Sequence, residues 1–294
     1  MPTSSQFKYH ALAFIVMTIW GATFASSKTL IVHGMPEVYI FFLRFIIAYV
    51  PLAAISHRKW MADNWRDELI MLLLGITGGS AYFMAENFGL HYAQSTDVAF
   101  IIAFTPLLTT LVAWIFHQER QQITRGFVLG LCIAMAGITL LIFKGDFQMQ
   151  PSLLGDSLAL LAALLWAFYS LLIKPVARRY SVTFITRKVF FYGWVTILPF
   201  LGGYSFKDTM ALLTEPVVTA NLLFLAVVAS FLCYLWWNIV LEKIGVLKSS
   251  YYLYVNPVAS AVVSMLFMDE VMNLSIAMGL VLILLGVMVS EKKI

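Results

Sequence analysis

The chain has 294 residues, of which 61% are hydrophobic and only 12% are charged, and its mean hydropathy is +0.88. Soluble domains are roughly 45–50% apolar and about 25% charged, so this composition excludes a soluble globular protein and indicates one dissolved in lipid. The net charge of +4 is explained by cationic loops at an anionic leaflet. It gives no reason to expect a nucleic-acid partner.

Ten apolar segments follow one another along the chain, each close to the roughly 20 residues that a helix needs to cross the hydrocarbon layer. They cover residues 9–29, 36–55, 69–91, 96–117, 123–143, 153–174, 183–203, 217–241, 248–268 and 272–290. The connections are short, and no soluble domain fits between them. Strands of a membrane barrel would alternate in segments of about 10 residues, and the sequence lacks that pattern. The segments predict an all-α integral membrane protein of ten helices.

The distribution of positive charge predicts the orientation of the helices. If the N-terminus is cytoplasmic, most Lys and Arg residues fall in inner segments, whereas the outer loops carry only Lys28, Lys144 and Lys207. Cytoplasmic loops of membrane proteins are enriched in Lys and Arg. We therefore expect a multi-pass protein of a bacterial-type inner (plasma) membrane with both termini in the cytoplasm.

The two halves of the chain share residues in the same order. The matches are Trp20 and Lys28 with Trp166 and Lys174, Arg44 with Arg187, Tyr82 and Glu86 with Tyr234 and Asn238, Pro106 and Glu119 with Pro257 and Glu270, and Gly130 and Gly137 with Gly279 and Gly286. Each half holds five predicted helices, an odd number, so the second copy enters the membrane from the opposite side. Inverted repeats of this kind are common in secondary transporters. We expect the repeats to span residues 1–146 and 147–294.

These motifs resemble the drug/metabolite transporter superfamily, in its ten-helix EamA-type branch. The resemblance is carried by the segment from Trp20 to Phe24, by Arg44, and by the stretch from Pro106 to Glu119 with the glycines that follow it. It covers essentially the whole chain. It implies a basket-like bundle around a central cavity and the export or exchange of small metabolites such as amino acids.

Glu86 is the most informative single residue, because a carboxylate inside an apolar membrane helix is costly and marks a functional site by default. Tyr82 lies one turn away on the same face. Glu86 either couples transport to protons or binds a substrate ammonium group; the alternative is a carboxylate that reaches water at the outer mouth. Its repeat partner Asn238, with Tyr234, is expected nearer the cytoplasm, where it contacts substrate or bonds neighbouring helices.

Two prolines fall near the midpoints of predicted membrane helices. Pro106 and Pro257 each free a backbone carbonyl and bend the helix, so we expect them to act as hinges, with fixed kinks as the alternative. The polar residues that precede them, Thr105 and Asn256, are expected to satisfy freed backbone groups or to contact substrate.

Aromatic residues near the bundle centre complete the predicted substrate site. Trp20 and Trp166 lie too deep for an interfacial belt, so they either line the cavity or pack between helices, and Tyr169 and Tyr254 add hydroxyl groups. The substrate-binding residues expected are Trp20, Tyr82, Glu86, Thr105, Trp166, Tyr169, Tyr234, Asn238, Tyr254 and Asn256.

We expect Arg44 and its repeat partner Arg187 to have a structural role. We expect no cofactor and no metal site, and a monomer or weak dimer whose partners are the lipid bilayer, a small-molecule substrate and, as an open alternative, protons. The mechanism expected is alternating access.

The sequence leaves two alternatives to transport, an intramembrane protease and a channel. The segment from Gly78 to Ala81 resembles the motif of an intramembrane serine protease with Ser80 as nucleophile, but that chemistry needs a nearby histidine. Histidines 10, 33, 57, 91 and 117 all lie at or beyond the ends of the predicted helices. A channel needs a filter or a ring of charge, for which no motif is present. We therefore expect that the protein is not an enzyme.

Overall fold

The computed structural model describes residues 4–116, 125–143, 153–245, 249, 251–267 and 274–290, and every regular element within them is helical. The α-helices are α1 (Ser4–Val32), α2 (Glu37–Ile55), α3 (Trp65–Gly75), α4 (Ala81–Tyr92), α5 (Ser95–Ile102), α6 (Thr105–Ile115), α7 (Arg125–Phe143), α8 (Leu153–Ala177), α9 (Val182–Leu201), α10 (Phe206–Leu212), α11 (Pro216–Leu223), α12 (Cys233–Ile244), α14 (Val255–Phe267) and α15 (Leu274–Ser290). Two π-helical segments, η1 (Ile76–Ser80) and η2 (Phe224–Leu232), and one 3₁₀ turn, η3 (Tyr251–Tyr254), complete them.

Seven helical stretches in this described part of the chain are long and apolar enough to cross a membrane. They are Phe7–Val32, Glu37–Ile55, Trp65–Tyr92, Ser95–Ile115, Leu153–Ala177, Val182–Leu201 and Pro216–Ile244. The other three predicted segments overlap α7, α14 and α15, which border residues outside the described part. Glu119 and Glu270 themselves lie outside the described part. The structure therefore shows an all-helical membrane protein, while the number of ten crossings stays a prediction.

The π-helical segments were not predicted. η1 joins α3 to α4, and η2 joins α11 to α12, so each one interrupts a predicted membrane helix. Within η1, Gly79 leaves helical geometry (φ −129°, ψ −108°). Adjacent glycines at 78 and 79 are a sequence signal for such a break, whereas the apolar segment of η2 carries none. Because π segments disturb the regular hydrogen-bond ladder, they often occur at functional sites.

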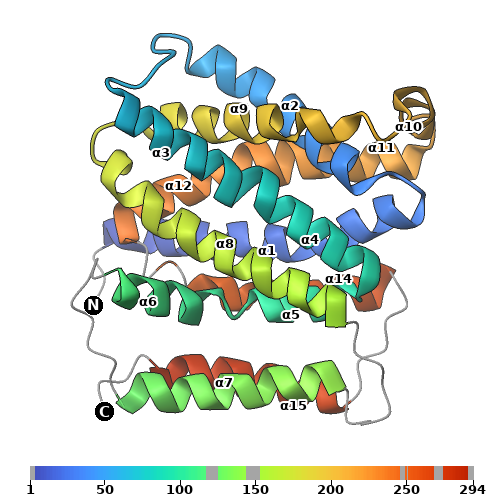
Figure 1. Cartoon of the computed structure of the whole chain (residues 1–294). Coiled ribbons are helices and arrows are strands. Elements are labelled where there is room, and N and C mark those ends of the chain that lie inside the picture. Colours follow the sequence, from blue (N-terminus) through green and yellow to red (C-terminus); the bar gives the residue numbers. More distant parts are fainter. Residues whose placement is uncertain are drawn as a thin grey trace.

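The helices of the two halves interleave. Figure 1 shows α1 running through the middle of the bundle, and it packs against α14 and α12 from the second half. In the same way α8 packs against α6 and α4 from the first half, and α2 packs against α9. α7 and α15 form a separate pair along one side of the bundle (Figure 1). Neither half encloses a core without helices from the other.

Glycines allow α3 and η1 to approach α9 closely. A β-carbon on Gly75 would lie 2.5 Å from the Cβ of Tyr192, and one on Gly79 would lie 3.3 Å from the Cα of Gly193. The close contact of α3 and η1 with α9 is therefore possible because these positions lack side chains. Small residues have the same effect at other membrane helix interfaces.

Arg187 lies near the N-terminal end of α9, where it contacts the connection between α2 and α3. Its guanidinium donates hydrogen bonds to the carbonyl oxygens of Ser56, Lys59 and Trp60. The neighbouring Lys188 pairs with Glu68 of α3. These contacts fit the structural role expected for Arg187.

Replacement of Gly75 by valine tests this close approach. The added side chain would meet the Cβ of Tyr192 and the backbone of Gly193, so the helices must separate, at a cost of about 1–3 kcal/mol. We expect Gly75→Val to lower the melting temperature of the detergent-purified chain. Gly202→Val is the matched control, because a β-carbon there meets nothing within 4 Å. Equal melting temperatures for both variants would contradict the packing described.

Candidate functional site

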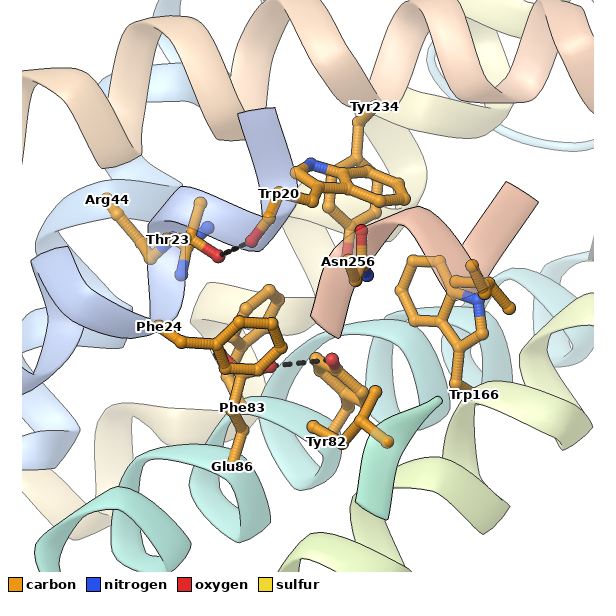
Figure 2. A pocket seen from close by; sticks show the side chains of 12 residues that line it. Trp20, Thr23, Phe24, Arg44, Tyr82, Phe83, Glu86, Trp166, Tyr234 and Asn256 are labelled. Atoms are coloured by element: carbon orange, nitrogen blue, oxygen red, sulfur yellow. Dashed lines mark hydrogen bonds between the residues drawn. The ribbon is translucent and has the colours of Figure 1, made fainter. Parts of the chain in front are cut away.

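A small buried cavity lies at the centre of the bundle, where helices of both halves meet (Figure 2). It is lined by Trp20, Thr23, Phe24, Arg44, Tyr82, Phe83, Glu86, Ile102, Trp166, Tyr234, Leu253 and Asn256. Its volume is about 30 Å³, which is room for about two water molecules. The lining combines two charged groups with a large aromatic surface.

Arg44 contributes a buried cation from α2. Only 1% of its surface is exposed. Its Nε donates a hydrogen bond to Ser230 Oγ at 2.9 Å, and its guanidinium lies over the Phe83 ring, 4.3 Å from the centroid. The Nη1 group is buried and makes no hydrogen bond to the protein. One donor of a fixed guanidinium is thus available to the cavity.

Glu86 contributes a buried carboxyl group from α4, and 2% of its surface is exposed. Its Oε2 accepts a hydrogen bond from the Tyr82 hydroxyl at 2.6 Å, while Oε1 is buried without a partner. Arg44 and Glu86 form no ion pair, although both line the same cavity. Since an uncompensated buried charge costs about 3–5 kcal/mol, each is placed to gain from a ligand of opposite charge.

Two neutral groups of the lining also lack protein partners. These are the Nε1 donor of Trp166 and the Oδ1 acceptor of Asn256. Figure 2 shows both residues on the side of the cavity opposite Arg44. Buried polar groups are almost always hydrogen-bonded, so four unsatisfied groups around one cavity are unusual. The cavity presents two donors and two acceptors.

Aromatic rings from both halves enclose this polar centre. Trp20 meets Trp166 edge to face, with ring centroids 5.5 Å apart and an interplanar angle of 87°. Trp20 also packs on Tyr234 at 5.6 Å, and Tyr82 packs on Trp166 at 5.1 Å. Such ring pairs stabilise each other beyond their burial. They form an apolar surface around the charged groups.

Two of these rings bond to the π-helical segments across the interface of the halves. The indole of Trp20 donates to the Ala229 carbonyl in η2 at 2.9 Å, and the Tyr234 hydroxyl donates to the Gly78 carbonyl in η1 at 2.5 Å. Each π segment is therefore tied to a cavity residue of the opposite half. A movement of either ring breaks a backbone contact of the other half.

Asn238 and Tyr169 lie beside the cavity, outside its lining. The Tyr169 hydroxyl donates to Asn238 Oδ1 at 3.0 Å, and Asn238 Nδ2 donates to Thr186 Oγ1 at 2.7 Å. The Tyr169 ring packs on Trp166 with centroids 5.0 Å apart. The hydrogen-bonded Tyr169 and Asn238 therefore pack beside Trp166 and hold its ring in place.

Six of the ten residues expected to bind substrate line the cavity: Trp20, Tyr82, Glu86, Trp166, Tyr234 and Asn256. Thr105 is buried elsewhere and donates to the Ile102 carbonyl at 2.6 Å, and the side chain of Tyr254 lies outside the described residues.

Pro106 lies in the first turn of α6 and Pro257 in the first turn of α14, and each follows a break in its predicted helix. Arg44 also lines the cavity, although only a structural role was expected for it from the sequence. Its signal was a charge within an apolar segment.

Ser80 has surroundings that differ from those of a protease nucleophile. Its hydroxyl accepts a hydrogen bond from Thr196 Oγ1 at 2.8 Å, whereas the histidines of the described part bond to other groups. In that same part, no group of three or more His, Cys, Asp or Glu side chains could hold a metal ion.

Comparison with known proteins gives relatives that match along nearly the whole chain. An uncharacterised transporter of Archaeoglobus fulgidus is 28% identical over 97% of this chain and 99% of its own length. A probable terminal-alkyne amino-acid exporter of Streptantibioticus cattleyicolor is 26% identical over 96% of this chain and 93% of its own. A probable amino-acid metabolite efflux pump of Escherichia coli is 25% identical over 95% of this chain and 93% of its own.

A solved crystal structure shares the fold, with a TM-score of 0.64 at 18% identity over 97% of this chain and 96% of the other. The sequence model of the EamA-like transporter family matches twice, over residues 7–143 and 153–291. The relatives are named as transporters, exporters or efflux pumps, and none of those above is named as an enzyme. The chain is a membrane transporter and belongs to the EamA-like transporter family.

Proposed function

We propose that this transporter exports or exchanges amino acids or closely related zwitterionic metabolites by alternating access. The observation that carries the proposal is the pair Arg44 and Glu86, two buried opposite charges that face one cavity without contacting each other. Two relatives named for amino-acid or amino-acid-metabolite export support the same substrate class.

The charges of the cavity match those of an amino acid. The Nη1 donor of Arg44 suits a carboxylate, because guanidinium groups bind carboxylates with short, charge-assisted hydrogen bonds. The free Oε1 of Glu86 suits an ammonium group, and the Tyr82 bond at 2.6 Å fixes the orientation of that carboxylate. The aromatic rings of Trp20 and Trp166 offer an apolar surface for a side chain. A molecule with one charge would leave the other residue unpaired.

The size of the cavity indicates which parts move. About 30 Å³ admits about two water molecules, which is less than an amino acid occupies. Substrate entry therefore requires displacement of cavity rings, including Trp20 and Tyr234. Trp20 bonds to η2 and Tyr234 bonds to η1. Displacement of these rings therefore changes the contacts of the helices that η2 and η1 interrupt, which are α11–α12 and α3–α4. Without such a movement, the cavity is too closed to hold the substrate.

Alternating access in the proposal uses two inverted repeats, 1–146 and 147–294, that cross the membrane ten times in total. The separate family-model match to each half supports the repeat. So does the packing, since α1 contacts α14 as α8 contacts α6, and α2 contacts η2 as α9 contacts η1. Helices at matching positions thus have matching partners. Inverted repeats supply two related states open to opposite sides.

Hinges and coupling complete the proposed mechanism. The breaks before Pro106 and Pro257 and the π segments η1 and η2 are the places where the backbone leaves regular α-helical geometry. In a proton-coupled cycle, Glu86 is the residue that binds the proton. The positive-inside pattern supports cytoplasmic termini in a bacterial-type inner membrane, and we propose a monomer or weak dimer.

Counterflow of three related molecules into proteoliposomes tests the zwitterion site. Leucine, isopentylamine and isocaproate share a side chain, but the amine lacks the carboxylate and the acid lacks the ammonium group. We expect the natural sequence to transport leucine in preference to both. Arg44→Gln and Glu86→Gln should each reduce leucine transport about tenfold to a hundredfold, the cost of one charged hydrogen bond.

The pattern of remaining preference separates the roles of the two residues. Arg44→Gln should lose its preference for leucine over isopentylamine, and Glu86→Gln should lose its preference for leucine over isocaproate. Arg66→Gln and Glu242→Gln are matched controls, because both side chains are exposed. If the two site variants keep the full discrimination of the natural sequence, the proposed site is wrong.

Tyr234→Phe tests the link between the cavity and η1. The change removes the hydroxyl that donates to the Gly78 carbonyl at 2.5 Å and leaves a buried acceptor unsatisfied, at a cost of about 1–3 kcal/mol. We expect a lower melting temperature and slower exchange. Tyr49→Phe is the control, since that ring packs on Phe191 and Trp194 at a distance from the cavity. Unchanged exchange in Tyr234→Phe would remove this contact from the mechanism.

A further inference from the structure

A second, larger hollow lies between α4 and α9. Its volume is about 510 Å³, and its lining is almost entirely apolar. It is lined by Val38, Ile76, Ser80, Ala81, Met84, Phe88, Thr196, Ile197, Phe200 and Tyr204. None of these residues lines the central cavity. We call this second hollow the lateral crevice.

The lateral crevice results from how two helices diverge. α3 and η1 press against α9 at glycine positions 75, 79 and 193. Beyond η1 the third helix continues as α4, which runs away from α9 (Figure 1). The space between the diverging helices is the crevice. The helices are therefore in close contact along α3 and η1 and are separated by the crevice along α4.

The crevice opens toward lipid. All of its lining residues except Tyr204 belong to the apolar stretches Glu37–Ile55, Trp65–Tyr92 and Val182–Leu201, each long enough to cross a membrane. Phe200 is 63% exposed and Tyr204 39% exposed at its rim. Surface that is exposed at this depth contacts hydrocarbon, and an exposed Tyr just beyond a span is typical of the membrane interface.

The chemistry of the lining selects an apolar occupant. Ser80 and Thr196 are its polar groups besides the Tyr204 hydroxyl, and they bond to each other at 2.8 Å. The carbonyls of Tyr192 and Gly193 are alternative acceptors for the single Thr196 hydroxyl proton, and when Thr196 donates to one of them the Ser80 hydroxyl is free to donate to Thr196 Oγ1. No polar group on the crevice floor therefore requires a ligand. This contrasts with the central cavity, where four polar groups are unsatisfied.

The length of the crevice matches one leaflet. From Ile76 to Phe88 the third helix advances 12 residues, or about 18 Å at 1.5 Å per residue. Half of the hydrocarbon layer is about 15 Å thick. We propose that the lateral crevice binds one acyl chain of a membrane lipid, with the headgroup near Tyr204. In the proposed orientation this lipid belongs to the outer leaflet, but its binding does not depend on the transport function.

A bound chain would act on the substrate site through α4. Tyr82 and Glu86 of this helix face the central cavity, whereas Ala81, Met84 and Phe88 line the crevice. An acyl chain between α4 and α9 would hold the substrate-facing side of α4 against the cavity. The lipid is thus a structural ligand beside the transported molecule.

A photoreactive lipid tests the proposal directly. The full chain is reconstituted in phosphatidylethanolamine and phosphatidylglycerol with a trace of phosphatidylethanolamine that carries a diazirine on one acyl chain. After illumination, mass spectrometry maps the labelled peptides. We expect the label to concentrate on residues 76–88 and 196–204. Label spread evenly over the lipid-facing surface of the bundle would overturn the proposal.

Variants that fill the crevice make the test specific. Ala81→Trp and Met84→Trp each place an indole in the space, and most of the label should be lost from both segments. Leu198→Trp is the matched control, since Leu198 is 42% exposed on α9 and does not line the crevice. In this variant the label on residues 76–88 and 196–204 should persist. Undiminished label in a folded Ala81→Trp or Met84→Trp chain contradicts the proposal. So does label that disappears on addition of leucine, because the crevice would then be a substrate path.

Discussion

The proposed transport site depends on keeping two groups of opposite charge apart inside a membrane protein. Arg44 and Glu86 are almost completely buried, line one cavity, and are held by different partners, Ser230 and Tyr82. Direct pairing would satisfy both and leave little reason to bind a ligand. Separated, each keeps an unsatisfied atom, at a cost of a few kcal/mol that a zwitterion can offset. The proposed binding site is thus maintained by the packing of the helices against the electrostatic attraction between Arg44 and Glu86.

The scaffold maintains this separation by taking helices from both halves. α1 and α2 carry Trp20 and Arg44, whereas Tyr234 and Ser230 come from the second half. The bonds from Trp20 and Tyr234 to η2 and η1 cross between the halves. Because those segments depart from α-helical geometry, they are suited to change shape when the rings move. Binding and backbone movement therefore share the same residues.

The sequence predicted much of this arrangement, because charge and aromatic rings inside apolar helices are visible without a structure. Glu86, Trp20 and Trp166 were predicted in this way, and all three line the cavity; their contact with substrate stays a prediction. Arg44 carries the same signal, but a structural role was expected for it as for Arg187; its place on the cavity is the reason that we propose a site role instead, whereas Arg187 bonds to the connection between α2 and α3. Asn238 was expected in the site and lies behind it, since the rotation of a helix about its axis depends on packing. The π segments and the lateral crevice are products of tertiary packing with no clear local pattern.

A structure with a bound amino acid tests the central claim most directly. The purified chain would be imaged with leucine, and the positions of its two charged groups compared with those of the cavity side chains. The account predicts the carboxylate within hydrogen-bond distance of Arg44 and the ammonium group within hydrogen-bond distance of Glu86, with Trp20 or Tyr234 displaced. A ligand bound elsewhere, or an Arg44–Glu86 ion pair that closes while leucine is transported, would contradict it.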